Sequence, residues 1–578
     1  MSARELITEH LDLWTEAVTK KSSSGRGSNG KVELTGVKKL RELILELAVR
    51  GKLVTQDKDD EPVDLLLEKI KSEKSAQLKT KRIRKPKKLP EVQETEQPFP
   101  IPESWRYCRL NELGVWGSGA TPKRGNAHYY GGGIPWFKSG ELYKDFIDSS
   151  EETITELAAQ ETSVRMNQPG DVLIAMYGAT IGKASILEVS GTTNQAVCAC
   201  TPWPGISNRF LLLLLKAYRS RFIAMGAGGA QPNISREKII ATVVGLPPEQ
   251  EQHRIVQKVD ELMALCDRLE QQTSDQLEAH ETLVDTLLST LTQSENATEL
   301  ADNWARLAAH FDTLFTTEQS IDKLKQTILQ LAVMGRLVEQ DAGDQCAQEL
   351  ITKLSAAKTA LIKDGELKKS RKLPDITDEE AGITLPSGWL LTRLGDAYDV
   401  RDGTHDSPKY ETTGYPLITS KNLSSGELSF DDVKLISESD HKKIQERSRV
   451  RQGDILFAMI GSIGNPVIVN TNREFSIKNV ALFKHYSDEL SCPSFLKLFL
   501  ENAAEDLKQQ AAGGVQSFVS LGKLRSWLIP LPPLAEQHRI VQKVDELMAL
   551  CDQLKKRLNQ ASETRCQLAE AVVASALG

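Results

Sequence analysis

The sequence predicts an α+β protein in which two mixed α/β modules are separated by two long antiparallel coiled-coil helices, with a pseudo-twofold internal repeat. Three observations predict this fold. The stretch EQHRIVQKVDELMALCD occupies 251–267 and returns unchanged at 536–552. The offset is 285 residues (536 − 251 = 285), close to half of the 578-residue chain. Other segments recur in the same order at nearly this offset, whereas a solenoid repeat has a period of roughly 20–50 residues.

Further repeated segments extend the duplication over most of the chain. KLRELILELAVRGKLVTQD at 39–57 resembles KLKQTILQLAVMGRLVEQD at 323–341. QPGDVLIAMYGATIG at 168–182 resembles RQGDILFAMIGSIG at 451–464. Because whole blocks recur in order, the chain consists of two copies of one large unit.

The repeat and the changes in composition divide the chain into five segments. They are an N-terminal helical region with a basic, proline-rich linker at 1–100, a first module at 101–246, a central repeat region with a long spacer helix and a second helical segment at 247–384, a second module at 385–531, and a C-terminal long spacer helix at 532–578.

The N-terminal segment predicts two helices. Apolar residues from Leu40 to Leu47 recur at helical spacing, and Gly51 follows as a stop signal, so the first helix is expected over 37–49. The second helix is expected to begin at about Pro62, since proline is tolerated in the first turn. The same pair of helices is expected again at 321–365.

The two modules contain short apolar runs that are interrupted by glycine. DVLIAMYGATIGKASIL at 171–187 and DILFAMIGSIGNPVIV at 454–469 each predict two strands joined by a turn. A helix is expected to follow in each module, which makes the modules mixed α/β. Both modules then end in a proline pair and a glutamate, in GLPPEQEQ and PLPPLAEQ, which predicts the start of a helix.

Each long helix carries apolar residues at alternating steps of four and three, a pattern typical of a coiled coil. The expected seam residues are Ile255, Val259, Leu262, Cys266, Leu269, Leu283 and Leu287 in the first copy, and Ile540, Val544, Leu547, Cys551, Leu554, Leu558 and Leu568 in the second. A helix of about 44 residues is about 66 Å long at 1.5 Å per residue. Two such helices would act as a ruler between two recognition modules, as in dimeric readers of DNA half-sites.

Composition indicates a globular chain of the cytoplasm without a membrane span. The longest apolar run, FLLLLL at 210–215, is far shorter than the roughly 20 residues that a span needs. Eight cysteines without a C-x-x-C pair fit a reducing compartment. The net charge is −7, but 248–296 alone carries 3 basic and 11 acidic residues, so the acid lies on the helices. The charge therefore neither excludes nor supports DNA binding.

The sequence contains no motif for catalysis or metal binding. A base-flipping adenine methyltransferase needs an N-P-P-[FY]-like loop, and no [DNS]-P-P-[FYW] occurs. GATIGKA at 178–184 is one residue short of a phosphate-binding loop and ends in Ala184. PDITDEE at 374–380 has the acids of a nuclease site but lacks a following E-x-K pattern. We therefore predict no catalytic residue and no metal site in this chain.

The order of these segments resembles the specificity subunits of type I restriction-modification systems over nearly the whole chain. The resemblance rests on four features that follow one another and occur twice: the module, the motif G-x-Q-x-x-x-S, the motif L-P-P-x-x-E-Q-H-R-I-V and the long helix. The N-terminal extension is similar to the subgroup called type IB. The resemblance implies that each module is a target recognition domain that reads one half of a bipartite, asymmetric double-stranded DNA sequence. It also implies docking of two modification subunits, which methylate adenine at N6, and two restriction subunits, and no catalysis by this chain. Its partners would use S-adenosylmethionine, ATP and Mg²⁺, and the chain itself would bind no cofactor.

The candidate DNA contacts are polar and basic residues of the glycine-rich loops at 117–142 and 401–423, because such side chains bind phosphates and base edges. They are Lys123, Arg124, Asn126, His128, Lys138 and Ser139 in the first module, and Arg401, Thr404, His405, Lys409, Ser420, Lys421 and Asn422 in the second. Weaker candidates near strand ends are Asn194, Gln195, Lys478 and Asn479. Gln231 and Gln516 recur in both modules, which favours a bracing or phosphate role over base reading.

Two other functions stay open at this point. The chain could be a self-sufficient methylase or nuclease, which the missing motifs disfavour. It could also be a coiled-coil adaptor whose modules bind no DNA.

Overall fold

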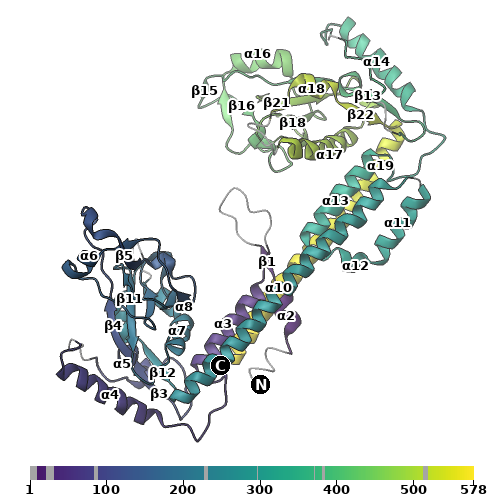
Figure 1. Ribbon diagram of the computed structural model, residues 1–578. Coiled ribbons are helices and arrows are strands. Elements are labelled where there is room, and N and C mark those ends of the chain that lie inside the picture. The colour runs from purple at the N-terminus through teal and green to yellow at the C-terminus, as the bar shows by residue number, and fades with distance from the viewer. Residues whose placement is uncertain are drawn as a thin grey trace. The chain divides into compact units, whose positions relative to one another are not determined.

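The structure is a computed structural model that describes residues 9–20, 32–83, 89–226, 232–295, 297–369, 372–380, 384–461, 463–511 and 518–577. The chain forms two compact units. The first unit comprises Met1–Gln276 and Ala561–Gly578, and the second comprises Leu277–Gln560. Each unit contains one module and one helical bundle (Figure 1).

Two long helices pass through both units. They are α10 (Glu249–Gln293) and α19 (Leu534–Leu577). In the first unit, Ile255 and Leu262 near the start of α10 share one hydrophobic core with Ala569 near the end of α19. In the second unit, Leu288 near the end of α10 shares a core with Ile540 near the start of α19. The two helices therefore run antiparallel in each unit, as the repeat predicted.

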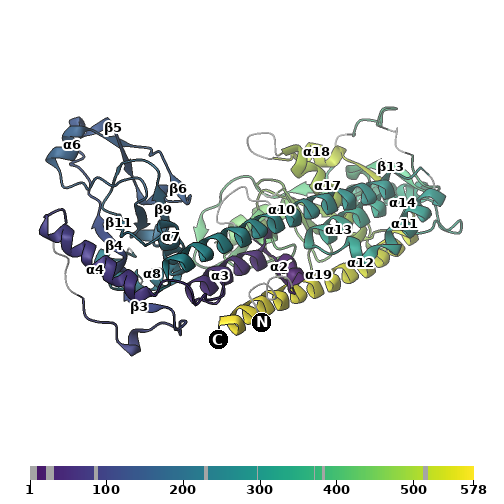
Figure 2. The ribbon, with the colours of Figure 1, turned by 60° about the horizontal axis from the view of Figure 1, so that its bottom comes forward.

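A third helix packs along the long helices in each unit, which the two-helix prediction did not include (Figure 2). It is α3 (Thr35–Val49) in the first unit and α13 (Glu318–Val333) in the second. Arg41 of α3 donates to Asp267 of α10 over 2.6 Å, and Arg50 donates to the Leu577 carbonyl of α19 over 2.7 Å. Lys323 pairs in the same way with Asp285 of α10 in the second unit.

The third helix also explains two errors in the expected seam. Leu283 and Leu568 are 50% and 52% exposed, while the neighbouring Val284 and Ala569 are buried. A helix with 3.6 residues per turn drifts by about 20° per heptad against a strict 3.5-residue repeat, so four heptads after Ile255 or Ile540 the next residue along lies closer to the original stripe. The third helix shares the hydrophobic core with the long helices, so the shifted stripe is buried.

The remaining elements of the first unit outside its module are short. They are α2 (Leu11–Glu16), β1 (Thr19–Lys20), β2 (Val32–Glu33) and α4 (Val63–Lys79). The structure begins α4 directly after Pro62, close to the expected start. In the second unit, α11 (Ala297–Ala309), α12 (Phe311–Leu314) and α14 (Ala347–Lys363) take the corresponding places in the chain.

The first module is built on a five-stranded sheet of order β4-β11-β8-β9-β6 and a three-stranded sheet of order β10-β5-β7, while β3 and β12 pair separately. Its strands are β3 (Arg106–Arg109), β4 (Gly114–Ser118), β5 (Tyr130–Phe137), β6 (Phe146–Ile147), β7 (Thr153–Ile154), β8 (Val172–Ala175), β9 (Ala184–Leu187), β10 (Thr192–Thr193), β11 (Val197–Pro202) and β12 (Val243–Leu246). Its helices are α5 (Leu110–Leu113), α6 (Glu156–Glu161), α7 (Asn208–Ala217), α8 (Arg219–Gly226) and α9 (Arg236–Ala241).

The second module has a closely related topology, with two four-stranded sheets, β14-β21-β18-β19 and β15-β17-β16-β20, and the pair β13-β22. Its first sheet ends at β19, without a strand in the place of β6, and its second sheet has one more strand, β15. Its strands are β13 (Leu390–Arg393), β14 (Asp399–Asp402), β15 (Tyr410–Glu411), β16 (Tyr415–Ile418), β17 (Lys434–Ile436), β18 (Ile455–Ala458), β19 (Gly464–Ile468), β20 (Ser476–Ile477), β21 (Val480–Lys484) and β22 (Leu528–Leu531). Its helices are α15 (Leu394–Ala397), α16 (Glu438–Ser448), α17 (Pro493–Ala511) and α18 (Leu521–Ser526). The strand pairs expected at 171–187 and 454–469 are β8–β9 and β18–β19.

A repeated joint fastens each long helix to the turn that follows the third helix. In the first unit, the Gln56 amide donates to the buried carboxylate of Glu251 over 2.9 Å, and Arg254 binds Asp60 over 2.8 Å. The turn needs Gly51, whose φ is +68° and where a Cβ would lie 2.5 Å from Pro102 Cγ. The first unit thus joins helix, turn and module at one point.

The second unit builds the same joint from corresponding residues. Gln340 donates to Glu536 over 3.2 Å, and Arg539 binds Asp344 over 2.7 Å. Gly335, with a φ of +70°, stands against Trp389 as Gly51 stands against Trp105. Because the repeated motif L-P-P-x-x-E-Q supplies the glutamate, the duplication of the sequence is a duplication of this joint.

Within the described residues, no helix combines the length and the apolarity needed to cross a lipid bilayer.

The buried glutamates predict a pH dependence of stability. Burial raises the pKa of Glu251 and of Glu536. A carboxyl whose pKa is raised on folding stabilises the protein below its unfolded pKa, about 4.3, and loses that contribution as the pH rises through the folded value. Glu251→Gln keeps an oxygen that accepts from Gln56 but removes the buried charge. The variant should therefore be more stable than the parent chain at about pH 8, and the difference should shrink as the pH falls.

Urea unfolding of the full chain between about pH 5 and pH 8 measures this difference. Glu278→Gln is the control, because Glu278 is an exposed residue of the same helix. The quantity compared is the stability of Glu251→Gln minus that of the parent chain at each pH. If this difference were smaller at high pH than at low pH, the carboxyl would not be buried and unfavourably ionised.

Candidate nucleic-acid interface

Three loops converge in each module on one backbone arrangement, which we call the loop frame. In the first module it consists of the residues after β4, after β5, and between β10 and β11. In the second module it consists of the residues after β14, after β16, and between β20 and β21. In the first module, the Gly119 amide donates to the Val197 carbonyl over 2.9 Å, and the Ala120 amide donates to the Thr193 carbonyl over 3.0 Å. The Asn194 amide donates to the Phe137 carbonyl over 3.0 Å and brings in the third loop.

The second module repeats these hydrogen bonds one for one. The amides of Gly403, Thr404 and Lys478 donate to the carbonyls of Val480, Ile477 and Ile418 over 2.9, 3.0 and 2.9 Å. The two loop frames are therefore the same structure, although the sequences around them differ.

Glycine is required where the loops cross. A Cβ on Gly119 would lie 2.2 Å from Thr193 Oγ1 and 2.3 Å from the Asn194 carbonyl oxygen. A Cβ on Gly403 would lie 2.2 Å from the Ile477 carbonyl oxygen. Since the contacts to the Asn194 and Ile477 carbonyl oxygens are to backbone atoms, a rotamer change could not relieve them, and the crossing point requires glycine in both modules.

The predicted basic residues of the first module fall into two groups. Lys123 and His128 are exposed, as expected for contacts to a large ligand. Arg124 and Lys138 instead converge on Glu152, each with a 2.6 Å contact to one carboxylate oxygen. These two cations lower the pKa of Glu152. Arg124 also lies over the rings of Tyr130 and Trp136, at 4.8 and 4.9 Å from their centroids.

The two polar candidates of this loop are partly used by the fold. Asn126 caps the 3₁₀ helix Ala127–Tyr129 by accepting from the His128 amide over 3.2 Å. Ser139 is half-buried at the start of the 3₁₀ helix Ser139–Glu141. Trp136 is 1% exposed and belongs to the core.

In the second module, Lys409, Lys421 and His405 are exposed, and Thr404 and Ser420 are half-buried. Arg401 is held by Asp399, whose carboxylate lies 2.7 Å from Arg401 Nε. Six of the seven candidates here thus lie at or near the surface of the loops, although the cation of Arg401 is already paired.

Asn422 has a structural position that the sequence did not reveal. Its side chain is 6% exposed, and Oδ1 accepts from the Thr419 amide over 3.0 Å while Nδ2 donates to the Asp431 carbonyl over 3.3 Å. The amide therefore caps the 3₁₀ helix Ser420–Leu423 from inside and is not presented to a ligand in this structure.

Sequence reasoning overlooked Thr121, which takes the place of His405. Each stands two residues after the crossing glycine, in GSGAT at 117–121 and RDGTH at 401–405. Aligning Gly119 with Gly403 would have revealed the correspondence. The recurring Gln231 and Gln516 lie outside the described residues, as do Arg84, Lys85, Lys87 and Lys88 of the basic linker that precedes the first module.

One of the acids at 374–380, Glu380, pairs with the module. Glu380 accepts from the buried Arg393 over 2.8 Å, just as Glu96 accepts from the buried Arg109 over 2.8 Å in the first unit. These pairs fasten the linker before each module to its first strand. Among the described residues, no cluster of three or more His, Cys, Asp or Glu side chains could hold a metal ion.

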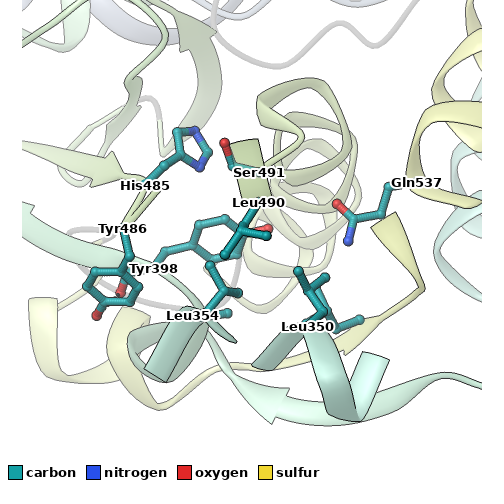
Figure 3. Close-up of a pocket in the computed structure, with 10 residues that line it drawn as sticks. Leu350, Leu354, Tyr398, His485, Tyr486, Leu490, Ser491 and Gln537 are labelled. Carbon is teal, nitrogen blue, oxygen red and sulfur yellow. Dashed lines mark hydrogen bonds between the residues drawn. The ribbon is translucent and has the colours of Figure 1, made fainter. Parts of the chain in front are cut away.

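A pocket of the second module lies apart from the loop frame (Figure 3). It is lined by Leu350 and Leu354 of α14, by Tyr398, by His485 and Tyr486 after β21, and by Gln537 of α19. Burial lowers the pKa of His485 to about 4, so the ring is neutral at physiological pH. Because β21 runs from the frame at Val480 toward His485, the pocket lies at the other end of this strand. Leu350 and Leu354 of α14 line it, so the pocket is the place where α14 packs on the module.

The geometry defines a class of binding protein with two modules of one design, each with its own surface loops and each joined to a helical bundle of the same kind. The family described as "Type I restriction modification DNA specificity domain" matches residues 102–279 and 386–563. The chain is 37% identical to the EcoAI specificity subunit and 35% identical to the EcoEI specificity subunit of Escherichia coli, with all of each chain covered.

The chain also resembles a crystal structure of the HsdS subunit from Thermoanaerobacter tengcongensis, at 19% identity and a TM-score of 0.41 over 84% of this chain and 99% of that one. From the full-length relatives and the two domain matches, the chain belongs to the specificity subunits of type I restriction enzymes, in the type IB group. It therefore has a role in DNA sequence specificity and is not the catalytic subunit. The resemblance found in the sequence is confirmed.

Proposed function

We propose that this chain recognises a bipartite, asymmetric DNA sequence, with one module on each half, and that it docks two modification and two restriction subunits. One observation carries the proposal. The two modules hold the same loop frame by the same hydrogen bonds, but the exposed side chains on that frame differ. Identical scaffolds with unlike surfaces suit a target whose two halves have different sequences.

Mapping of methylated adenines tests the first part. The complex of this chain with its modification subunits should methylate one DNA sequence made of two unlike parts and a spacer without sequence preference. Binding of the same complex to random duplexes should fade as salt rises, while binding to the mapped sequence persists. Equal salt sensitivity on both DNAs would instead favour the adaptor that binds no specific sequence.

The repeated helix supports two identical partners. In the seventeen repeated residues, buried positions could be identical because the bundles are alike. However, several positions that are exposed in both copies are identical too, namely His253 and His538, Gln257 and Gln542, Asp260 and Asp545, Glu261 and Glu546, and Asp267 and Asp552. Packing does not require identity at exposed positions, whereas docking of one kind of partner on both copies does.

Charge reversal on the repeated surface tests the docking. Glu261→Lys should reduce the number of bound modification subunits from two to one, and Glu261→Lys with Glu546→Lys should leave none, because like charges now face the partner. Native mass spectrometry of the assembled complex counts the subunits. Glu278→Lys, at an exposed position of α10 outside the repeat, is the matched control. Two bound subunits in the double variant would contradict this docking surface.

The role of the long helices as a ruler can be tested by lengthening both. Seven residues inserted after Gln276 in α10 and after Gln560 in α19 fall at the boundary between the units and add about two helical turns, or about 10.5 Å. The mapped DNA spacer should lengthen by about 3 base pairs at about 3.4 Å each, with both half-sites unchanged. A seven-residue insertion after Gly365, beyond the end of α14, is the control. An unchanged spacer in the lengthened chain would refute the ruler.

A further inference from the structure

The loop frame of each module presents one pair of exposed polar side chains at the same place. In the first module the Thr121 hydroxyl donates to Gln195 Oε1. In the second, His405 Nδ1 lies 3.0 Å from Asn479 Oδ1. Thr121 and His405 come from the loop after β4 or β14, and the amides come from the turn before β11 or β21. The positions correspond, but the chemistry of the pair differs.

In the second module, the amide residue is anchored from behind by the crossing loops. Asn479 has a φ of +56°, a conformation that asparagine tolerates better than most residues, and its amide N–H donates to the Thr404 carbonyl over 3.1 Å. His405 is fixed in turn, since its Nε2 lies 2.9 Å from the carboxylate of Asp402, which is 4% exposed and also binds Arg447. The side chain of His405 is nevertheless 51% exposed. The pair is thus rigidly held and accessible.

The charge distribution separates these pairs from the nearby cations. Arg124, Lys138 and Arg401 are already neutralised by carboxylates, so binding a phosphate would break existing ion pairs. Gln195 and Asn479 carry no charge, and each offers N–H donors and a carbonyl acceptor side by side. An amide of this kind can bind the N6 and N7 atoms of adenine at the same time, whereas it gains little from a phosphate.

We propose that Gln195 and Asn479 are base-reading residues at corresponding positions of the two half-sites, with Thr121 and His405 as the residues that position them. Each amide reads one base pair in the major groove, and adenine is the base that its donor and acceptor fit. The inference rests on the proposed function, because it assumes that the modules bind specific DNA. It adds to the proposed function the side chains that distinguish the DNA sequences of the two half-sites.

The test uses the complete complex with its modification subunits and maps the methylated sequences. Gln195→Glu replaces the amide donor by an acceptor, which pairs with the N4 amino group of cytosine. The variant should lose preference at one base pair of one half-site by about ten- to hundredfold, and the other half-site and the spacer should be unchanged. Asn479→Asp should do the same in the other half-site only. Thr121→Val should weaken the preference at the base pair that Gln195→Glu affects.

Matched controls separate base reading from a structural effect. Gln168 is also exposed and accepts from a hydroxyl, that of Ser190 over 3.3 Å, but it precedes the opposite end of β8 from the frame. Gln168→Glu and Asn472→Asp should leave the mapped sequence unchanged. If a frame variant assembles poorly, the sequences that it still methylates are compared, because a purely structural defect lowers methylation at all sequences alike.

The outcomes distinguish this inference from the proposed function. A parent complex that methylates no defined bipartite sequence overturns the proposed function. The base-reading pairs alone are overturned if the parent complex has a defined target but the Gln195→Glu and Asn479→Asp variants keep every base preference. They are also overturned if these variants change several positions at once.

Discussion

The buried carboxylate at the start of each long helix is the constraint on which the architecture depends. Glu251 and Glu536 are almost completely inaccessible, and each accepts from a glutamine of the turn that ends the third helix. A buried carboxylate must find a partner, because an unpaired one is destabilising by several kcal/mol, on the order of the cost of other buried charges. The helix, the turn and the tryptophan of the module are therefore brought to one point, twice.

This joint connects two parts of the protein with different roles, a helical scaffold and the loop surfaces of the two modules. On the scaffold side, α3 and α13 bind the long helices through ion pairs and a shared apolar core. On the surface side, the crossing glycines Gly119 and Gly403 hold three loops together by backbone hydrogen bonds. Since backbone bonds do not depend on side-chain identity, the exposed residues can vary without loss of the frame.

The roles of several candidate loop residues can be recognised only in the folded chain. Arg124 and Lys138 looked like phosphate ligands, but they share one glutamate. Asn422 looked like a base reader, but it caps a helix from the interior. The residues that remain available are exposed lysines, which suit phosphate, and uncharged pairs such as Thr121 with Gln195, which suit base edges. An interface that combines the two provides both affinity and sequence discrimination.

The sequence by itself determined the duplication, the antiparallel long helices, the strand pairs of both modules and the family, because repeats and apolar periodicity are local signals. The tertiary structure decided which residues those signals bring together. It added α3 and α13 to the bundle and moved the buried stripe from Leu283 and Leu568 to their neighbours, since helix packing depends on partners distant in sequence. It also brought Gln195 beside Thr121, 74 residues apart, because the meeting of two loops depends on strand pairing that no local pattern records.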